Sequence, residues 1–301
     1  MPRLITVGID DSPESRAAAE WAAREAALRD LPVRLLHVRQ PVPQPASRAP
    51  LLGGETRQHW NERTPRDAAE GLALRHPGAE VIMEQRVGAP AAVLVEAARD
   101  AEMLVLGSRA LSGLGGLLLG SVAQSVVGRT TTPVILVRAG EQAADEHVMD
   151  PAGVPSAATP FRPLVLGVDT ERPDDTLLAF AFEEARRRRC SLHAVHGWHL
   201  PSAYPYALAA GAVLNGEMAR RQAAVLTGTL RPWQRKFPDV GVGRISRLDS
   251  PSHLLVETAR DASLVVVGRR VRRGRLGAHI GTVAHAVLQH STAPVAVVAH
   301  E

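Results

Sequence analysis

Gly107-Ser-Arg-Ala-Leu-Ser-Gly-Leu-Gly-Gly-Leu-Leu-Leu-Gly-Ser121 joins two apolar segments, residues 103–106 and 122–127. The first segment predicts a buried parallel strand, and the spacing of the second fits a helix. A strand, a glycine-rich turn and a helix start together form an arrangement that binds phosphate, because free backbone N–H groups and the positive end of the helix dipole converge there. We therefore predict an anion-binding loop in this stretch.

The candidate binding residues come from the two ends of this loop. Gly107 would let the chain leave its strand beside a ligand, and Gly120 would do the same before the helix. Ser121 is expected either to cap the helix or to donate its hydroxyl to a phosphate oxygen. The candidates in this loop are Gly107, Ser108, Arg109, Gly120, Ser121 and Val122.

The same pattern occurs again near the end of the chain. Gly268 ends the apolar run 264–267 and is followed thirteen residues later by Gly281 and then Thr282, the spacing of the first loop. Outside the loops, Pro90-x5-Glu96-x-Ala-Arg-Asp matches a second copy at a constant offset of 161 residues. A gene duplication explains this repeat.

Strand and helix patterns alternate through both halves, which predicts an α/β fold with two doubly wound, five-stranded parallel sheets in tandem, of the Rossmann-like type. The domains are expected at 1–139 and 162–301, joined by a linker at 140–161 that has no periodicity. The expected strands are 4–9, 33–38, 81–87, 103–106 and 134–137, then 164–168, 191–196, 242–247, 264–267 and 295–298.

Length and composition limit the classes of protein that fit. The chain has 301 residues, enough for two domains. No apolar run approaches the roughly 18 residues of a membrane span, so we expect a cytoplasmic protein with no membrane partner. Cys190 is the only cysteine, which leaves no intrachain disulfide and no thiolate metal cluster. A net charge of +4 and 3% aromatic residues do not favour nucleic-acid binding.

An aspartate ends the first strand pattern of each half. Asp10 precedes a turn and a helix start, and Asp169 takes the same place in the second half. Open parallel sheets bind ligands at the carboxyl ends of their strands, so both carboxylates are candidates for ligand contact. The alternative for Asp10 is that it caps the following helix.

These residues resemble the universal stress protein family in its tandem form, which has the adenine nucleotide alpha hydrolase-like fold. The resemblance rests on Asp10, Asp169, the segments 36–38 and 195–197, and the signature Gly-x2-Gly-x9-Gly-Ser/Thr. It implies binding of ATP, with or without Mg²⁺. The implied contacts are the loop glycines and hydroxyls with the triphosphate, Asp10 and Asp169 with the nucleoside, and Val38 with the adenine.

Both halves depart from the signature at its second glycine, where Ala110 and Val271 stand. If that position requires a positive φ, alanine costs about 1 kcal/mol, and a β-branched residue fits less well still. We therefore expect the first half to bind ATP, through Asp10, Val38, Gly107, Gly120 and Ser121. We expect the second half, with Asp169, Gly268, Gly281 and Thr282, to bind weakly or not at all.

Two further groups of residues leave alternatives open. The arginines of the second loop, at 269, 270, 272, 273 and 275, could bind phosphate, bind nucleic acid or be solvated. His37 and His196 are expected to be hydrogen-bonded structural histidines.

The sequence favours an adenine-nucleotide-binding stress protein in which ATP acts as a regulatory ligand. No Gly-x4-Gly-Lys-Ser/Thr motif is present, so the P-loop mechanism lacks its lysine. The alternatives are a nucleotide-independent interaction module, or a weak ATPase or self-phosphorylating protein with Ser121 as acceptor. We also expect homo-oligomers that pair through the last strands, 134–137 and 295–298.

Overall fold

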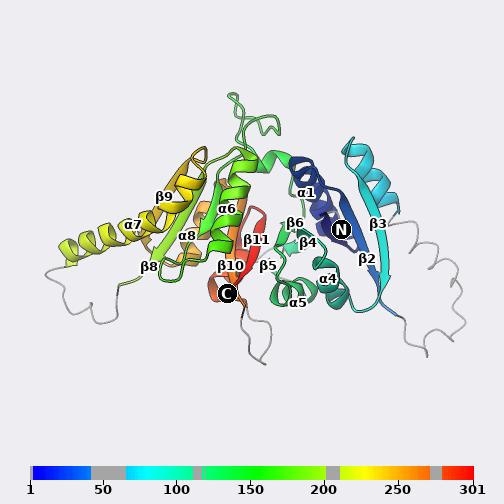
Figure 1. The fold of residues 1–301 in the computed structure, drawn as a ribbon. Coiled ribbons are helices and arrows are strands. Elements are labelled where there is room, and N and C mark those ends of the chain that lie inside the picture. The colour runs from blue at the N-terminus through cyan, green and yellow to red at the C-terminus, as the bar shows by residue number, and fades with distance from the viewer. Residues whose placement is uncertain (1–2, 42–65, 111–116, 119, 201–210, 272–279) are drawn as a thin grey trace, which may run out of the picture. The chain divides into compact units, whose positions relative to one another are not determined.

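The computed structural model describes residues 3–41, 66–110, 117–118, 120–200, 211–271 and 280–301 (Figure 1). The chain divides into two compact units, the first ending at residue 142 and the second beginning at residue 143. Each unit has a parallel sheet and a hydrophobic core.

Five parallel strands form the sheet of the first unit in the spatial order β3, β2, β1, β4, β6. A two-residue strand, β5, pairs antiparallel with the end of β4. Helices connect the parallel strands, as right-handed crossovers require. The strands are β1 (Ile5–Ile9), β2 (Val33–Arg39), β3 (Val81–Val87), β4 (Met103–Ala110), β5 (Leu117–Leu118) and β6 (Val134–Arg138). The helices are α1 (Pro13–Arg29), a helical segment over 66–75, α4 (Pro90–Ala98) and α5 (Ser121–Arg129).

The helices of the first unit cover both faces of its sheet. A Cβ atom on Gly107 would point at Glu14 of α1, whereas one on Gly8 would meet Leu94 of α4. Helix α5 contacts α4 and so lies on the face opposite α1. The two faces therefore have separate helix layers, as in other doubly wound sheets.

The core of the first unit combines apolar packing with one satisfied cation. Trp21 of α1 is buried against the sheet, and Arg34 of β2 is only 8% exposed. Arg34 donates to the Thr6 hydroxyl at 2.8 Å and to the Ala97 carbonyl at 2.8 Å, and lies 3.5 Å from Glu84. A buried guanidinium is tolerated here because its donors have partners.

The second unit repeats this architecture in the spatial order β9, β8, β7, β10, β11. Among the described residues, no helix combines the length and the apolar character needed to cross a membrane. The strands are β7 (Leu164–Gly167), β8 (Leu192–Trp198), β9 (Val242–Leu248), β10 (Leu264–Arg270) and β11 (Val295–His300). The helices are α6 (Asp175–Arg188), α7 (Gly211–Lys236), α8 (Pro251–Thr258), the 3-10 turn η3 (Ala259–Asp261) and α9 (Thr282–His290).

The predicted fold class is confirmed, because the described part of each unit has a doubly wound sheet of five parallel strands. Most predicted carboxyl ends of the strands differ from the observed ones by one or two residues, and two strands are longer than predicted by more. The strand predicted at 103–106 continues to Ala110, and the one predicted at 264–267 continues to Arg270. The residues after Gly107 therefore belong first to a strand, and any turn begins later than predicted.

The segment expected to be a linker, 140–161, has local structure. It contains the 3-10 turn η1 (Ala143–Glu146), and His147 forms an isolated bridge with Phe161. Asp150 accepts hydrogen bonds from the backbone N–H groups of Ala152 and Val154. Short-range hydrogen bonds of this kind hold a turn that no hydrophobic periodicity signals.

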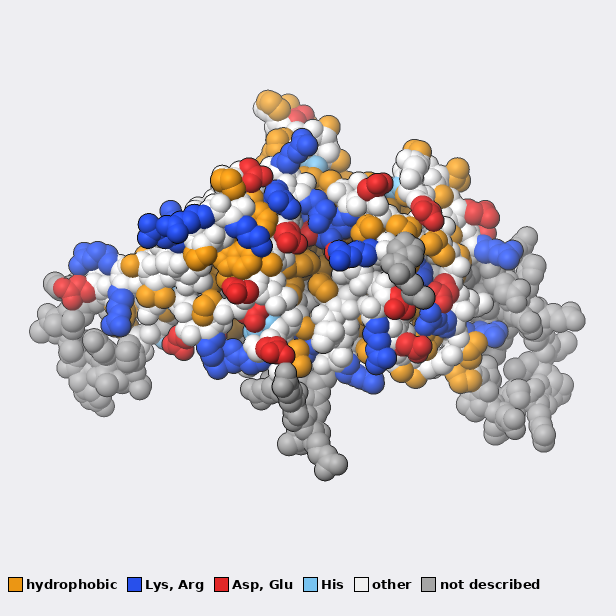
Figure 2. All heavy atoms as spheres, in the orientation of Figure 1, with side chains coloured by type: hydrophobic (Ala, Val, Ile, Leu, Met, Phe, Trp, Pro, Cys, Tyr) orange, Lys and Arg blue, Asp and Glu red, His pale blue; other side chains and the backbone are white. Residues whose placement is uncertain are grey.

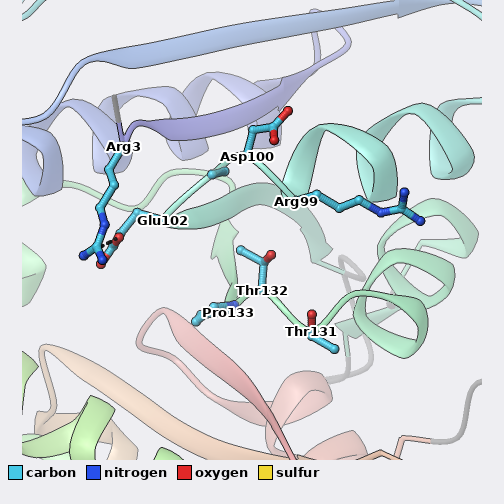
Figure 3. Close-up of a pocket in the computed structure, with 8 residues that line it drawn as sticks. Arg3, Arg99, Asp100, Glu102, Thr131, Thr132 and Pro133 are labelled. Atoms are coloured by element: carbon cyan, nitrogen blue, oxygen red, sulfur yellow. Dashed lines mark ion pairs between the residues drawn. The ribbon is translucent and has the colours of Figure 1, made fainter. Parts of the chain in front are cut away.

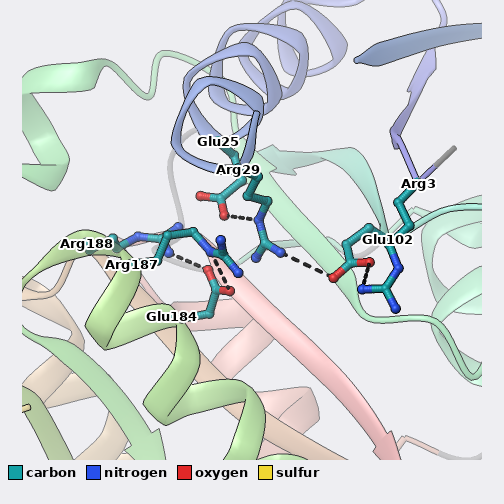
Figure 4. Close-up of polar contacts among 7 residues, drawn as sticks. All are labelled: Arg3, Glu25, Arg29, Glu102, Glu184, Arg187 and Arg188. Atoms are coloured by element: carbon teal, nitrogen blue, oxygen red, sulfur yellow. Dashed lines mark hydrogen bonds and ion pairs between the residues drawn. The ribbon is translucent and has the colours of Figure 1, made fainter. Parts of the chain in front are cut away.

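Both units carry a buried glutamate–arginine pair one turn apart on their first long helix (Figure 4). In α1 the Glu25 carboxylate lies 2.5 Å from the Arg29 guanidinium, and in α6 Glu184 lies 2.5 Å from Arg188. The two pairs are separated by a constant 159 residues, so the duplication preserved this ion pair as well as the strands.

Charged side chains of both signs occur together on the surface. On the face drawn in Figure 2, arginine and acidic side chains are interspersed among apolar ones. The described residues on this face therefore do not form the continuous basic surface that is typical of a nucleic-acid-binding protein.

Candidate functional site

The strand order of the first unit creates a ligand position at the carboxyl edge of its sheet. From β1 the chain continues to β2 on one side, whereas β4 lies on the other. Such a reversal leaves a crevice outside the carboxyl ends of the strands, where doubly wound proteins bind ligands. Asp10 follows β1, Val38 lies near the end of β2, and Gly107 lies in the last half of β4. The structure therefore brings these three predicted residues to one edge.

Asp10 organises the turn that follows β1. Its Oδ1 accepts hydrogen bonds from the Ser12 hydroxyl at 2.5 Å and the Ser12 N–H at 3.3 Å. The cap of α1 is Ser12, which accepts from the Ser15 N–H at 3.1 Å, so Asp10 supports the cap without being it. Asp11, between them, has a left-handed backbone with φ 63°. The exposed Asp10 carboxylate keeps its second oxygen without a hydrogen bond among the described residues.

Gly107 has a packing role that differs from its predicted one. A Cβ atom at this position would lie 2.5 Å from the backbone carbonyl carbon of Glu14 and 2.7 Å from its oxygen. The first turn of α1 therefore rests directly on β4 at this glycine. Gly107 is needed for helix packing, and the expectation that it leaves room for a ligand is wrong on this face.

Gly120 and Ser121 present an open helix start. Gly120 is the N-cap of α5, has no side chain to cap it, and a Cβ there would meet nothing within 4 Å. Ser121 is the first residue of α5 and makes no cap, so that part of its predicted role is wrong, whereas its side chain is exposed. Val122 is also exposed, and the first turn contains no acidic residue. The first-turn N–H groups, which have no acceptor inside the helix, therefore face an accessible edge.

The remaining candidates of the first loop are placed less favourably. Ser108 is buried, and its hydroxyl donates to the Val137 carbonyl at 3.3 Å, so it is not available to a ligand. The backbone of Arg109 pairs with Leu118, and its side chain lies outside the described residues.

In the second unit the equivalent edge is partly filled by its own side chains. A Cβ on Gly268 would lie 2.6 Å from the His300 imidazole and 3.1 Å from Leu177 of α6. His300 in turn lies 3.6 Å from the carboxylate of Asp174, the N-cap of α6. Gly281, like Gly120, has open space around its Cβ position, and Thr282 begins α9 with an exposed side chain.

The loop after β7 also differs from its counterpart after β1. Asp169 accepts hydrogen bonds from the N–H groups of Glu171 at 3.1 Å and Arg172 at 3.3 Å. The Arg172 guanidinium lies 3.9 Å from the other carboxylate oxygen. Helix α6 begins six residues after Asp169, whereas α1 begins three residues after Asp10. The second carboxylate is therefore more fully engaged by its own loop than the first.

The argument from strain at the second signature position does not apply. Ala110 lies in β4, and the positive-φ residues other than glycine are Asp11, Asp30 and Arg189 among those described. Val271 has an ordinary backbone and donates its N–H to the His300 carbonyl at 2.7 Å. The difference between the units therefore lies in His300 and the Asp169 loop, and does not come from a forced backbone at Val271.

The structure decides between some of the alternatives for the histidines and the arginine-rich segment. His196 is buried, with Nδ1 3.2 Å from the Val168 carbonyl and Nε2 3.2 Å from Gln222, as expected of a structural histidine. His37 lies 3.3 Å from the Gln85 amide. Arg269 is 5% exposed and lies within β10, so the solvated alternative is wrong for it. The arginines at 272, 273 and 275 lie outside the described residues.

Sequence reasoning missed Arg138, the last residue of β6. It pairs in register with Ser108, and its buried Nε has no hydrogen-bond partner among the residues that the structure describes. Burial lowers the pKa of the Arg138 guanidinium. An arginine directly after an apolar run is common on solvated strand ends, so the sequence held no signal that separated it from those.

Two other features were tested as ligand sites. Asp249, His253 and Glu257 place three potential metal ligands within 4.8 Å of one another at the start of α8. Asp249 already bonds His253 at 3.0 Å, and Glu257 bonds Arg247 at 3.2 Å, so we assign no metal there.

A cavity of about 590 Å³ lies at the amino ends of β1, β4 and β6, the opposite edge from Asp10. It contains the Arg3–Glu102 ion pair (Figure 3).

Comparison with known proteins agrees with this architecture. The model of the universal stress protein family matches residues 1–138 and again 160–299. A universal stress protein of Mycolicibacterium smegmatis is 35% identical over 304 residues, which cover 98% of this chain and 96% of the relative. One from Mycobacterium tuberculosis is 35% identical over 307 residues, covering 97% and 96%.

Solved structures show the same fold at lower identity. A universal stress protein from Archaeoglobus fulgidus superposes with a TM-score of 0.68 at 16% identity, over 99% of this chain and 98% of that one. A putative universal stress protein from Pseudomonas aeruginosa gives a TM-score of 0.59 at 16% identity, over 99% and 94%.

The two doubly wound units, each with a helix start at the carboxyl edge of its sheet, define a tandem α/β protein of the Rossmann-like class. The chain belongs to the universal stress protein family.

Proposed function

We propose that the first unit binds an adenine nucleotide, ATP by its resemblance, at the carboxyl edge of its sheet. The observation that carries this proposal is the start of α5: its first-turn N–H groups have no side-chain cap among the described residues, Gly120 adds no side chain, and no carboxylate lies in the turn. A helix N-terminus of this kind attracts phosphate through its amides and its dipole.

The other predicted residues supply the remaining contacts. The free oxygen of Asp10 accepts from a ribose hydroxyl, and the half-buried Val38 packs against the base. The exposed Ser121 hydroxyl donates to a phosphate oxygen. Gly107 acts indirectly, because it lets α1 approach β4 and so fixes the Asp10 turn.

In this proposal the second unit binds the nucleotide weakly or not at all. Asp169 is held by its own loop and by Arg172, and His300 fills the space over Gly268. A single nucleotide per chain then acts as a ligand that orders the binding loop and the surface around it, with hydrolysis or self-phosphorylation slow. A cytoplasmic location, and self-association through β6 and β11, stay predictions.

Ligand release followed by calorimetry tests the function. Denaturing freshly purified protein and analysing the supernatant by mass spectrometry should yield an adenine nucleotide. Titration of stripped protein with ATP, with and without Mg²⁺, should give a stoichiometry near one. Bound ATP should also raise the thermal midpoint, because a ligand that binds only the folded state stabilises it.

The rival function is a nucleotide-independent interaction module, favoured by the filled edge of the second unit. It would be supported if no nucleotide is released and ATP leaves the thermal midpoint unchanged, both in the wild type and in Gly120→Ala. Two equal tight sites would instead contradict the proposed difference between the units.

A further inference from the structure

Each unit has an arginine in the ladder formed by the two strands that its last helix connects, but on opposite strands of that ladder. In the first unit Arg138 of β6 stands in register with Ser108 of β4. In the second unit Arg269 of β10 stands in register with Ala299 of β11. The offset of 161 residues makes Ser108 the counterpart of Arg269 and Arg138 the counterpart of Ala299. The guanidinium has therefore changed strands between the repeats while staying at one edge.

Strand geometry decides which face these arginines occupy. The Cβ direction of Gly107 points at α1, and successive residues of a strand alternate between faces, so Ser108 points to the opposite side. Residues in register in a parallel ladder share a face, which puts Arg138 on the side of α4 and α5. By the same argument Gly268 faces Leu177 of α6, and Arg269 points to the side of α8 and α9.

The last helix of each unit begins at this same edge and on this same face. Helix α5 connects β4 to β6, so its N-terminus lies at the carboxyl ends of these two parallel strands. Arg138 ends β6 at that position. The first turns of α5 and α9 contain no acidic residue. Arg138 and the positive end of the α5 dipole therefore lie at the same edge and on the same face of the sheet, and the first turn of α5 contains no carboxylate.

Arg138 differs in this respect from Arg34, which is buried in the same unit. Arg34 is satisfied by Thr6, the Ala97 carbonyl and Glu84. Arg138 has a buried Nε without a partner among the described residues, and burial lowers its pKa with no carboxylate to offset the effect. A partly desolvated cation without a counter-charge among the described residues is costly, and a bound anion would supply that charge.

We propose that Arg138 is the phosphate-binding cation of the first unit and contacts the outer phosphates of the nucleotide together with the first-turn amides of α5. Its positive charge replaces that of the phosphate-binding lysine of P-loop proteins, whose sequence motif is absent from this chain. A guanidinium suits this task because its fork of N–H donors matches two phosphate oxygens. This inference rests on the proposed function and extends it by assigning a residue that recognises the phosphates of the nucleotide.

The test compares ligands that differ in their phosphates. Calorimetric titrations of the full chain use ATP, AMP, adenosine and inorganic tripolyphosphate. The variants are Arg138→Met, which removes the charge at similar length, Arg138→Lys, which keeps it, and Arg39→Ala. Arg39 is a matched control, because it is an exposed arginine at the carboxyl end of β2 on the same edge.

Arg138→Met should weaken ATP and tripolyphosphate binding by about tenfold or more and leave adenosine unchanged, as expected for loss of a charge-assisted contact. Arg138→Lys should recover part of this loss, and Arg39→Ala should change none of the four affinities. An equal loss for ATP and adenosine would overturn the inference, because it would show a structural role. Binding of tripolyphosphate but not adenosine by the wild type, with loss in Arg138→Met, would reject the adenine nucleotide and retain the phosphate-binding role. Binding of neither would reject both.

Discussion

The backbone of Glu14 lies where a side chain on Gly107 would have to go, with 2.5 Å between its carbonyl carbon and the Cβ position. Because the obstacle is the backbone of a helix, it cannot move aside as a side chain would. The glycine at the start of the loop pattern therefore holds the first helix against the sheet.

Gly107→Ala should therefore destabilise the first unit by about 1–3 kcal/mol, the usual cost of overpacking. Gly120→Ala should cost less, about 1 kcal/mol, because its Cβ meets open space and only the quality of the cap changes. Thermal and urea unfolding of the two variants measure the difference. Equal effects would show that α1 adjusts freely, against the packing role.

Gly268→Ala provides an internal comparison in the second unit. The atoms in its way belong to the His300 ring and the Leu177 side chain, which can rotate, whereas Glu14 presents its backbone to Gly107. We expect Gly268→Ala to be less destabilising than Gly107→Ala in the same unfolding assay. The reverse order would indicate that His300 is held rigidly by Asp174.

The sequence was sufficient for the fold and insufficient for the roles of individual site residues. Apolar runs and the 161-residue repeat predicted both sheets, because burial on two faces requires continuous apolar strands. The strand ends at Ala110 and Arg270 were missed because Gly-Ser-Arg in the first unit and Gly-Arg-Arg in the second interrupt the apolar pattern. The contact of Gly107 with Glu14 joins residues 93 positions apart, and a local pattern does not report it.

Arg138 shows the same limit for the candidate site. An arginine after Val-Ile-Leu-Val has the pattern of a solvated strand end. Its importance depends on its register with Ser108 and on the missing partner of its Nε, both of which are three-dimensional facts. The helix that begins at Ser121, by contrast, was predicted to within one residue from its local apolar spacing, although its cap is Gly120 and not Ser121.

Loss of the Arg34 charge should destabilise the first unit strongly. Arg34→Met leaves the Ala97 carbonyl and the Thr6 hydroxyl without their donor and leaves Glu84 without its partner. Removing one member of a buried polar network costs about 3 kcal/mol or more. Chemical unfolding measures the loss, and Arg39→Met, on the exposed end of the same strand, should change stability by less than about 0.5 kcal/mol. A small effect at Arg34 would mean that water replaces its hydrogen bonds.

Glu20 should make stability depend on pH in the acid range. Burial tends to raise the pKa of Glu20, but hydrogen bonds from His76 and Arg75 outweigh it, so the pKa is lowered in the folded chain. A depressed carboxyl pKa contributes stability above its unfolded value of about 4.3 and loses it as pH falls through the folded value. Glu20→Gln should be less stable than wild type at pH 7, and the difference should disappear near pH 3. A pH-independent difference would contradict this origin.

The difference proposed between the units predicts unequal effects of two matched substitutions. Ser121 and Thr282 begin α5 and α9, carry exposed hydroxyls and follow glycine caps with open Cβ positions. Ser121→Ala should weaken ATP binding by about three- to tenfold, the loss expected for one solvent-accessible hydrogen bond worth about 1 kcal/mol. Thr282→Ala should leave ATP affinity and stoichiometry unchanged, because Arg172 and His300 already occupy the contacts around Asp169 and Gly268. Titration calorimetry on both variants decides the point: a loss at Thr282 equal to that at Ser121 would show that the second edge opens to the nucleotide despite its own side chains.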